Sequence, residues 1–206
     1  MKTTNNQIEE LLTRNVEDVI VRADLEKKLK SGKKLRIKLG FDPTGNRLHI
    51  GRAVTLWKLR QFQDLGHHIT FVIGDFTAQI GDSSDKDSER KMLTLEEVKE
   101  NFRDYHAQLS LILDMDKVEL FHNGSWFNKM RLDKFFQLAS LFTIQQMTER
   151  DNFAKRIKAG KPVGMHETLY PLFQGYDSVE MKTDLEVGGT DQLFNMLAGR
   201  SIQKHF

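Results

Sequence analysis

Apolar residues occupy every second position of LRIKLGF (residues 35–41), with Arg36, Lys38 and Gly40 between them, and this alternation is typical of a β-strand. A continuous apolar run, ITFVIGDF (69–76), predicts a second strand. Two shorter stretches, KVELF (117–121) and DLEVGG (184–189), predict two more. The chain is therefore expected to contain a sheet of few strands.

Apolar residues three or four positions apart predict helices in most of the remaining chain. We expect them over 4–30 (with room for one break), 51–65, 94–113, 133–149, 166–178 and 190–204. Asn5 is the expected N-cap of the first helix, and Gly66 the expected end of the second. The order strand, helix, strand over 35–76 favours a βαβ crossover, and hence a parallel sheet with right-handed connections.

No linker, repeat or low-complexity tract divides the sequence, so residues 1–206 are expected to form one α/β domain. Residues 124–165 would then be a helical insertion before the last strand. Because that strand comes shortly before residue 206, we expect the sheet to be incomplete at its C-terminal end.

Composition narrows the function classes only slightly. The chain has no cysteine, which excludes disulfides, thiolate zinc sites and a cysteine nucleophile within it. It has no apolar run of membrane-spanning length, and MKTTNNQIEE lacks a signal-peptide pattern, so we expect a cytoplasmic protein without a membrane partner. A net charge of +2 is too small to indicate a nucleic-acid partner.

Residues 40–52 carry the first chemical signal. The predicted strand ends at Gly40, a turn follows, and the next helix begins near Gly51 with its free amide groups facing the carboxyl end of the strand. Such an arrangement suits a phosphate, with Thr44 and His49 at its rim, and Gly51 would leave room for a flat ring. An ordinary loop with a capping threonine and an exposed histidine is equally compatible with the spacing.

Four stretches together resemble one family. GFDPTGNRLHIG (40–51), GDFTAQIGDSS (74–84), LYPLFQGYDS (169–178) and VGGTDQLFN (187–195) are similar, in order and spacing, to the signature segments of class I aminoacyl-tRNA synthetases of the tyrosyl type. The resemblance runs from about residue 30 to the end. It implies a Rossmann-like parallel sheet flanked by helices, as in the catalytic domain of class I synthetases.

The resemblance also implies a reaction and its ligands. The carboxylate of L-tyrosine would attack the α-phosphate of ATP, which enters with Mg²⁺, and the complete enzyme would transfer the tyrosyl group to tRNA(Tyr). No protein nucleophile and no protein-bound metal are required, so the protein's task is positioning and charge stabilisation. His67-His68 and His166-Glu167 lack metal-site spacing and are interpreted as surface or packing residues.

Residue by residue, the resemblance implies three sets of contacts. The catalytic residues would be Thr44, His49 and Arg52, and the ATP ligands Gly40, Asp42, Gly51, Gly189 and Asp191. The tyrosine ligands would be Asp82, Tyr170, Gln174, Asp177 and Gln192, with Asp177 accepting a hydrogen bond from the substrate hydroxyl. Lys86 and Arg90 fall where the family has basic residues near pyrophosphate.

The sequence departs from the family at several places. Arg52 replaces the second signature histidine, Lys38 stands where several members have a tyrosine, and Ser83 and Asp85 replace the usual Pro and Gly. Nothing resembles the Lys-Met-Ser-Lys-Ser loop or the anticodon-binding region, so we expect a catalytic-domain portion truncated before both.

Three functions stay open on the sequence alone. The first is the catalytic portion of a tyrosine-tRNA ligase, expected to be a homodimer. The second is a relative that binds tyrosine or a nucleotide without turnover, which Arg52 would favour. The third is an interaction protein that uses the apolar face of 133–149. The simplest interpretation of that face is part of the core, and the second is a dimer contact. The face comprises Phe135, Phe136, Leu138, Leu141 and Phe142.

Overall fold

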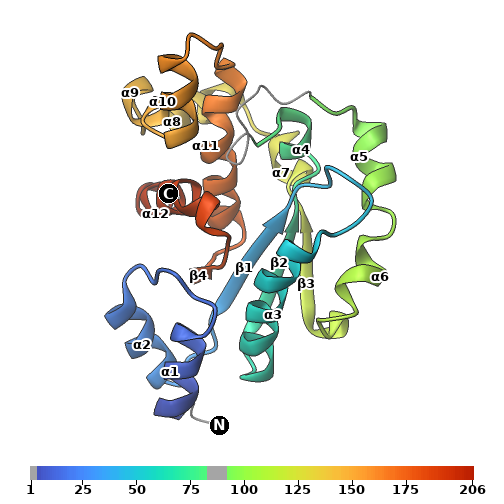
Figure 1. Cartoon of the computed structure of the whole chain (residues 1–206), viewed down its shortest axis with the longest axis vertical. Helices are drawn as coiled ribbons and strands as arrows, with labels where there is room; N and C mark the ends of the chain where they lie inside the picture. Colours follow the sequence, from blue (N-terminus) through green and yellow to red (C-terminus); the bar gives the residue numbers. More distant parts are fainter. Residues whose placement is uncertain (1–3, 83–91) are drawn as a thin grey trace.

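A computed structural model describes residues 4–82 and 92–206 of the chain. At its centre lies a parallel sheet in the order β3-β2-β1-β4 (Figure 1). The strands are β1 (Arg36–Phe41), β2 (His68–Ile73), β3 (Val118–His122) and β4 (Leu185–Glu186). Each lies within or next to a predicted strand, so the expected parallel α/β fold is confirmed.

Helices surround the sheet, and most of them lie in ranges predicted as helical. The N-terminal half contains α1 (Asn5–Thr13), α2 (Arg22–Lys30), α3 (Ile50–Asp64), α4 (Thr77–Ile80), α5 (Leu95–Phe102) and α6 (Tyr105–Leu109). The C-terminal half contains α7 (Gly124–Phe127), α8 (Leu132–Ala139), α9 (Ile144–Thr148), α10 (Asp151–Lys158), α11 (Met165–Glu180) and α12 (Leu193–His205). Short 3-10 turns at Met115–Lys117 and Thr190–Gln192 precede β3 and α12.

Three expectations about helix boundaries were wrong. The first helix is capped by Thr4, whose side chain accepts from the Gln7 amide in a capping box, and not by Asn5. The predicted helices 94–113 and 133–149 are each two shorter helices. The second of them breaks where Thr143 opens a new capping box at α9, because a Thr with Gln146 three residues later is a start signal.

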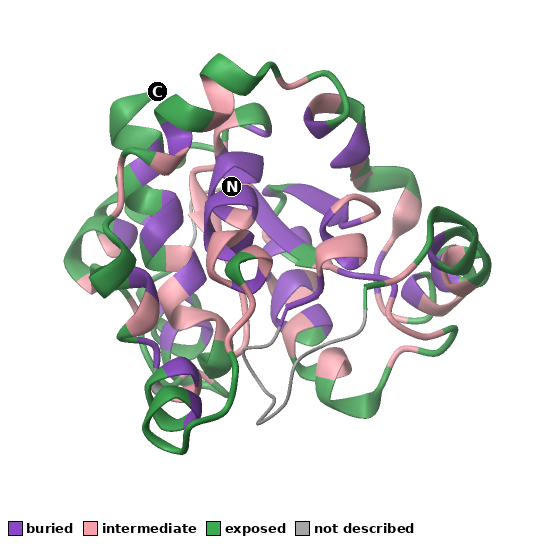
Figure 2. Ribbon diagram, turned by 90° about the horizontal axis from the view of Figure 1, so that it is seen from above, coloured by how far each residue is buried: buried purple, intermediate pink, exposed green. Residues whose placement is uncertain are grey.

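Two apolar clusters stabilise the fold. The larger packs β1 and β2 against α1, α2, α3 and α6, and includes Ile37, Leu39, Leu59 and Phe71. The second joins α7, α8, α9, α11 and α12 around Phe173. Buried residues accordingly gather on the strands and on the inner faces of the helices (Figure 2). None of the helices in the described ranges is long and apolar enough to cross a membrane.

Close packing of α11 on α12 fixes one wall of the cavity at the candidate active site. A Cβ built on Gly175 would lie 3.0 Å from the Gly199 Cα and 2.6 Å from the Ile202 Cδ1. Only glycine allows the two backbones to approach so closely. This contact holds α12, and the loop before it, beside the helix that carries Tyr170 and Asp177.

Candidate active site

The candidate site is a cavity of about 750 Å³ at the carboxyl ends of the central strands, where open parallel sheets bind ligands. Every site residue predicted from the sequence that lies in the described ranges lines it. These are Gly40, Asp42, Thr44, His49, Gly51, Arg52, Asp82, Tyr170, Gln174, Asp177, Gly189, Asp191 and Gln192. Lys86 and Arg90, like Ser83 and Asp85, lie outside the described residues.

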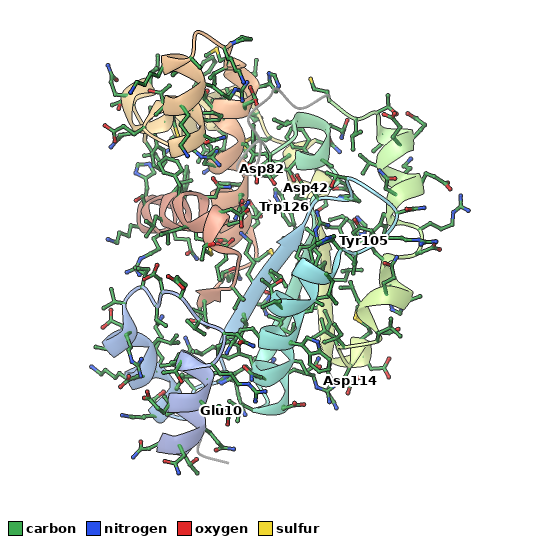
Figure 3. The ribbon with its side chains drawn as sticks, in the orientation of Figure 1. Glu10, Asp42, Asp82, Tyr105, Asp114 and Trp126 are labelled. Atoms are coloured by element: carbon green, nitrogen blue, oxygen red, sulfur yellow. The ribbon has the colours of Figure 1, made fainter. Side chains whose placement is uncertain are left out.

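The buried carboxylate of Asp42 is at the centre of this region. Its Oδ1 accepts from the Thr77 hydroxyl at 2.7 Å and its Oδ2 from the Tyr170 hydroxyl at 2.9 Å. A Cβ on Gly74 would collide with Asp42 Oδ1, so glycine is required there. In Figure 3, Asp42, Asp82 and Trp126 gather around the upper tip of β1, far from Glu10 and Asp114.

Residues 44–52 form the rim of the cavity. The helix α3 begins at Ile50, and His49 is its N-cap, with Nδ1 accepting from the Gly51 amide at 3.0 Å. One of the free backbone amides expected at the start of this helix, that of Gly51, is therefore already bonded. Because Nδ1 accepts, the ring proton of a neutral His49 lies on Nε2, and the exposed ring can donate to an anion. Thr44, half-buried, lies on the same rim.

Arg52 is held within the protein. Its Nη1 donates to the Asp42 carbonyl oxygen at 3.3 Å and lies 3.4 Å from the Tyr105 hydroxyl, and its guanidinium stands 4.8 Å from the centre of the Phe41 ring. Burial raises the pKa of Tyr105, so this phenol stays neutral and donates to the Gly45 carbonyl oxygen. Arg52 thus joins the turn after β1 to α6 while still lining the cavity.

A chain of polar side chains crosses the cavity wall from Asp82, just after α4, to Gln174 on α11. Gln192 donates to Asp82 at 2.7 Å and to Asp191 at 2.8 Å, while Asn195 donates to both Gln192 and Gln174. Two of these residues, Asp82 and Gln174, are among the tyrosine ligands that the resemblance implies. These two residues and Tyr170 line the same cavity. Together they carry three acceptor groups, which matches the three protons of an ammonium.

Sequence reasoning missed the arginine behind this cluster. Arg150 Nη2 lies 3.6 Å from Asp82 Oδ1, and its guanidinium stacks near the rings of Phe153 and Phe194. Burial lowers the pKa of Arg150, and the Asp82 carboxylate opposes that effect. Nothing in the sequence spacing signals this pair, since the two residues come from different elements.

Asp177 occupies the inner end of the cavity. Its Oδ1 accepts from the Trp126 indole at 3.0 Å and its Oδ2 from the Asn123 amide at 3.3 Å. Burial raises the pKa of Asp177 to about 7, against the lowering effect of Lys38 and of these two donors. Gln174 and Asp177 line the same cavity, as their spacing on one helix predicts.

Lys38 is buried in the wall of the cavity. Strand alternation suggests a solvent-facing side chain, yet Lys38 is 1 % exposed because α11 covers that face of β1. Its Nζ donates to the Gln174 carbonyl oxygen at 2.7 Å and to Ser178 Oγ at 2.9 Å, and lies 3.1 Å from Glu186 Oε1. Glu186, another cavity residue, had no signal in the sequence beyond its place at a strand end.

Within residues 4–82 and 92–206, no group of three or more His, Cys, Asp or Glu side chains could hold a metal ion. His67, which accepts from the Leu35 amide through Nδ1, and Glu167, which pairs with Arg156 at 2.8 Å, are buried packing residues as interpreted. Along the face expected as core, Leu138 is buried, whereas Phe136 is 65 % exposed.

Comparisons with known proteins agree with this geometry. Residues 29–206 match the sequence profile of the family described as tRNA synthetases class I (W and Y). The chain is 51% identical over 196 residues to a tyrosine–tRNA ligase of Aromatoleum aromaticum, covering 95% of this chain and 49% of that protein. It is 49% identical over 204 residues to the enzyme of that name from Dehalococcoides mccartyi, covering 99% of this chain and 52% of that protein.

Solved structures show the same architecture. A C-terminally truncated mitochondrial tyrosyl-tRNA synthetase of Coccidioides posadasii superposes with a TM-score of 0.80 at 26% identity, over 96% of this chain and 60% of that one. The chain spans about half the length of the curated relatives it matches.

The buried carboxylate at the inner end of the cavity leads to a prediction about stability. The pKa of Asp177 is about 7 in the fold and ~3.9 in an unfolded chain, so the native protein loses stability as pH rises from ~4 through about 7. Between pH 5 and pH 8, its free energy of unfolding should fall by roughly 2–3 kcal/mol relative to that of Asp177→Asn.

Urea unfolding of both proteins at the two pH values measures this difference. Asp133→Asn, which removes an exposed carboxylate, serves as the matched control. Its free energy of unfolding should follow that of the native protein at both pH values. If the difference between native protein and Asp177→Asn were the same at pH 5 and pH 8, the titration assigned to Asp177 would be wrong.

Proposed function

Because the chain belongs to the class I tRNA synthetases for tryptophan and tyrosine, we propose that it is the catalytic portion of a tyrosine-tRNA ligase. Residues 1–206 would form one catalytic domain that binds L-tyrosine and ATP. In the complete enzyme the tyrosyl group would pass to tRNA(Tyr). The single observation that carries this proposal is the cavity lined at once by the expected phosphate-side and amino-acid-side residues.

The amino acid would lie with its side chain toward the inner end of the cavity. Its ammonium would donate to Asp82, Tyr170 and Gln174. The Tyr170 hydroxyl already donates to Asp42, so its oxygen is oriented to accept. The phenol hydroxyl of the substrate would donate to Asp177, whose position is fixed by Trp126. Phenylalanine has no hydroxyl to donate to this buried carboxylate, which disfavours its binding; tyrosyl-tRNA synthetase is the standing example of this logic.

ATP would enter over the rim, with Mg²⁺ bound to its phosphates as part of the substrate. His49 would donate from Nε2 to the outer phosphates, next to Thr44. The exposed Asp191, with Gly189, would hold the ribose, and Gly51 would face the adenine. The tyrosine carboxylate, beside Gln192, would attack the α-phosphate, the bond to the bridging oxygen would break, and pyrophosphate would leave. Positioning and charge stabilisation suffice for this step.

A binding protein without turnover is the second candidate. The observation that favours it is that the Arg52 guanidinium is already engaged by the Asp42 carbonyl oxygen and the Phe41 ring. In that case tyrosine would bind and no adenylate would form.

The cytoplasmic location stays a prediction of the sequence.

Pyrophosphate exchange tests the proposed reaction. With tyrosine and Mg²⁺-ATP, the chain should incorporate labelled pyrophosphate into ATP, and phenylalanine should support far less exchange. In Asp177→Ala the exchange ratio of tyrosine to phenylalanine should fall by about 10²-fold or more. Thr55→Ala, which alters another cavity residue on α3, should keep the ratio. An unchanged ratio in Asp177→Ala would mean that Asp177 does not contact the substrate hydroxyl.

We also propose that the chain forms a homodimer through α8, α9 and the start of α11, which lie together at the upper left of Figure 1. Large apolar side chains there are exposed: Leu132 by 74 %, Phe136 by 65 %, Ile144 by 77 % and Met165 by 76 %. Such side chains are suited to burial against a second copy.

Sedimentation velocity tests the dimer. The native chain should sediment as a dimer at micromolar concentration, and Phe136→Glu should sediment as a monomer because it places a charge in the apolar interface. Trp57→Glu, an equally drastic change at an exposed site on α3, should remain dimeric. A monomeric native chain would contradict the proposed interface.

A further inference from the structure

Lys38 and Glu186 form a buried ion pair in the wall of the proposed tyrosine pocket. They are register partners on the neighbouring parallel strands β1 and β4, and their charged atoms lie 3.1 Å apart. Lys38 is 1 % and Glu186 12 % exposed. A charge pair in such a place stabilises a fold poorly, since desolvation offsets most of the attraction. Its position beside the pocket therefore suggests a role other than stability.

The pair holds the turn of α11 that carries Asp177. Lys38 donates to the Gln174 carbonyl oxygen and to Ser178 Oγ. Glu186 accepts from Gln174 Nε2 at 3.1 Å and from Ser178 Oγ at 3.2 Å. Gln174, one helical turn before Asp177, and Ser178, directly after it, are thus fixed to both strands, which sets where the Asp177 carboxylate stands.

The same pair acts on the charge of Asp177. The Lys38 ammonium lowers the pKa of Asp177, whereas the Glu186 carboxylate raises it. Tyr170, on the same helix, also interacts electrostatically with Asp177, and burial raises the pKa of Tyr170 so far that it stays neutral. The two neighbours that donate to Asp177, Asn123 and Trp126, carry no charge.

We propose that Lys38 and Glu186 are specificity-determining positioning residues: Lys38 keeps Asp177 ionised to accept the substrate hydroxyl, and Glu186 holds Lys38 in place while opposing its effect. This inference rests on the proposed function, because it concerns how the same pocket recognises tyrosine. It has a direct consequence for pH. Tyrosine affinity should be lost as pH falls through the pKa of Asp177, and the pair should set that midpoint.

Tyrosine binding by calorimetry from pH 5.5 to pH 8.5 tests this. For the native chain, affinity should fall about tenfold per pH unit below a midpoint near the pKa of about 7. Glu186→Gln removes the opposing charge and keeps an acceptor for Lys38, so its midpoint should be lower. The double variant Lys38→Gln/Glu186→Gln leaves no unpaired charge, and its midpoint should lie above that of Glu186→Gln by roughly half a pH unit or more.

Control variants separate charge from structure. Lys58 is another buried lysine, bonded to the carbonyl oxygens of Leu11 and Arg14 far from the pocket, so Lys58→Gln should keep the native midpoint. Variants that merely loosened α11 would lose affinity equally at every pH.

Two results would overturn the inference, and they are distinguishable. Equal midpoints in Glu186→Gln and the double variant would refute the role of Lys38 while leaving tyrosine binding intact. Absence of tyrosine binding by the folded native chain at every pH would instead refute the proposed function, and this inference with it.

Discussion

The two hydrogen bonds accepted by Asp42 are the constraint on which the site depends. They join the end of β1 to Thr77 at the start of α4 and to Tyr170 on α11, elements that are far apart in the sequence. Gly74 makes the approach possible because any side chain there would collide with the carboxylate. With these three elements fixed, the rim formed by 44–52 and the inner wall formed by α11 face each other across one cavity.

The cavity wall also buries several charged side chains. It contains Lys38, Asp42, Asp82, Asp177 and Glu186, all at least half-buried. Buried charges are costly unless they are paired or hydrogen-bonded, and here each has such a partner within the described residues. An amino acid, which carries an ammonium and a carboxylate, is the kind of ligand that such a surface can recognise.

Much of this could be predicted from the sequence, for identifiable reasons. The strand alternation at 35–41 and the apolar run at 69–76 reflect local periodicity, and motif residues such as His49 and Tyr170 lie at fixed offsets within short segments. Trp126 and Arg150 could not be found in this way, and neither could the burial of Lys38, although the resemblance marks its position. Their environments arise when α11 covers one face of β1, when α7 meets Asp177, and when α10 meets the loop after α4, and no local pattern encodes such contacts.

The most direct test of the account is a crystal structure of the chain with bound L-tyrosine. We expect the phenol hydroxyl to lie within hydrogen-bonding distance of Asp177 and the ammonium to lie among Asp82, Tyr170 and Gln174. A tyrosine bound elsewhere, such as in the smaller hollow of about 380 Å³ between Trp126 and Tyr176, would contradict it.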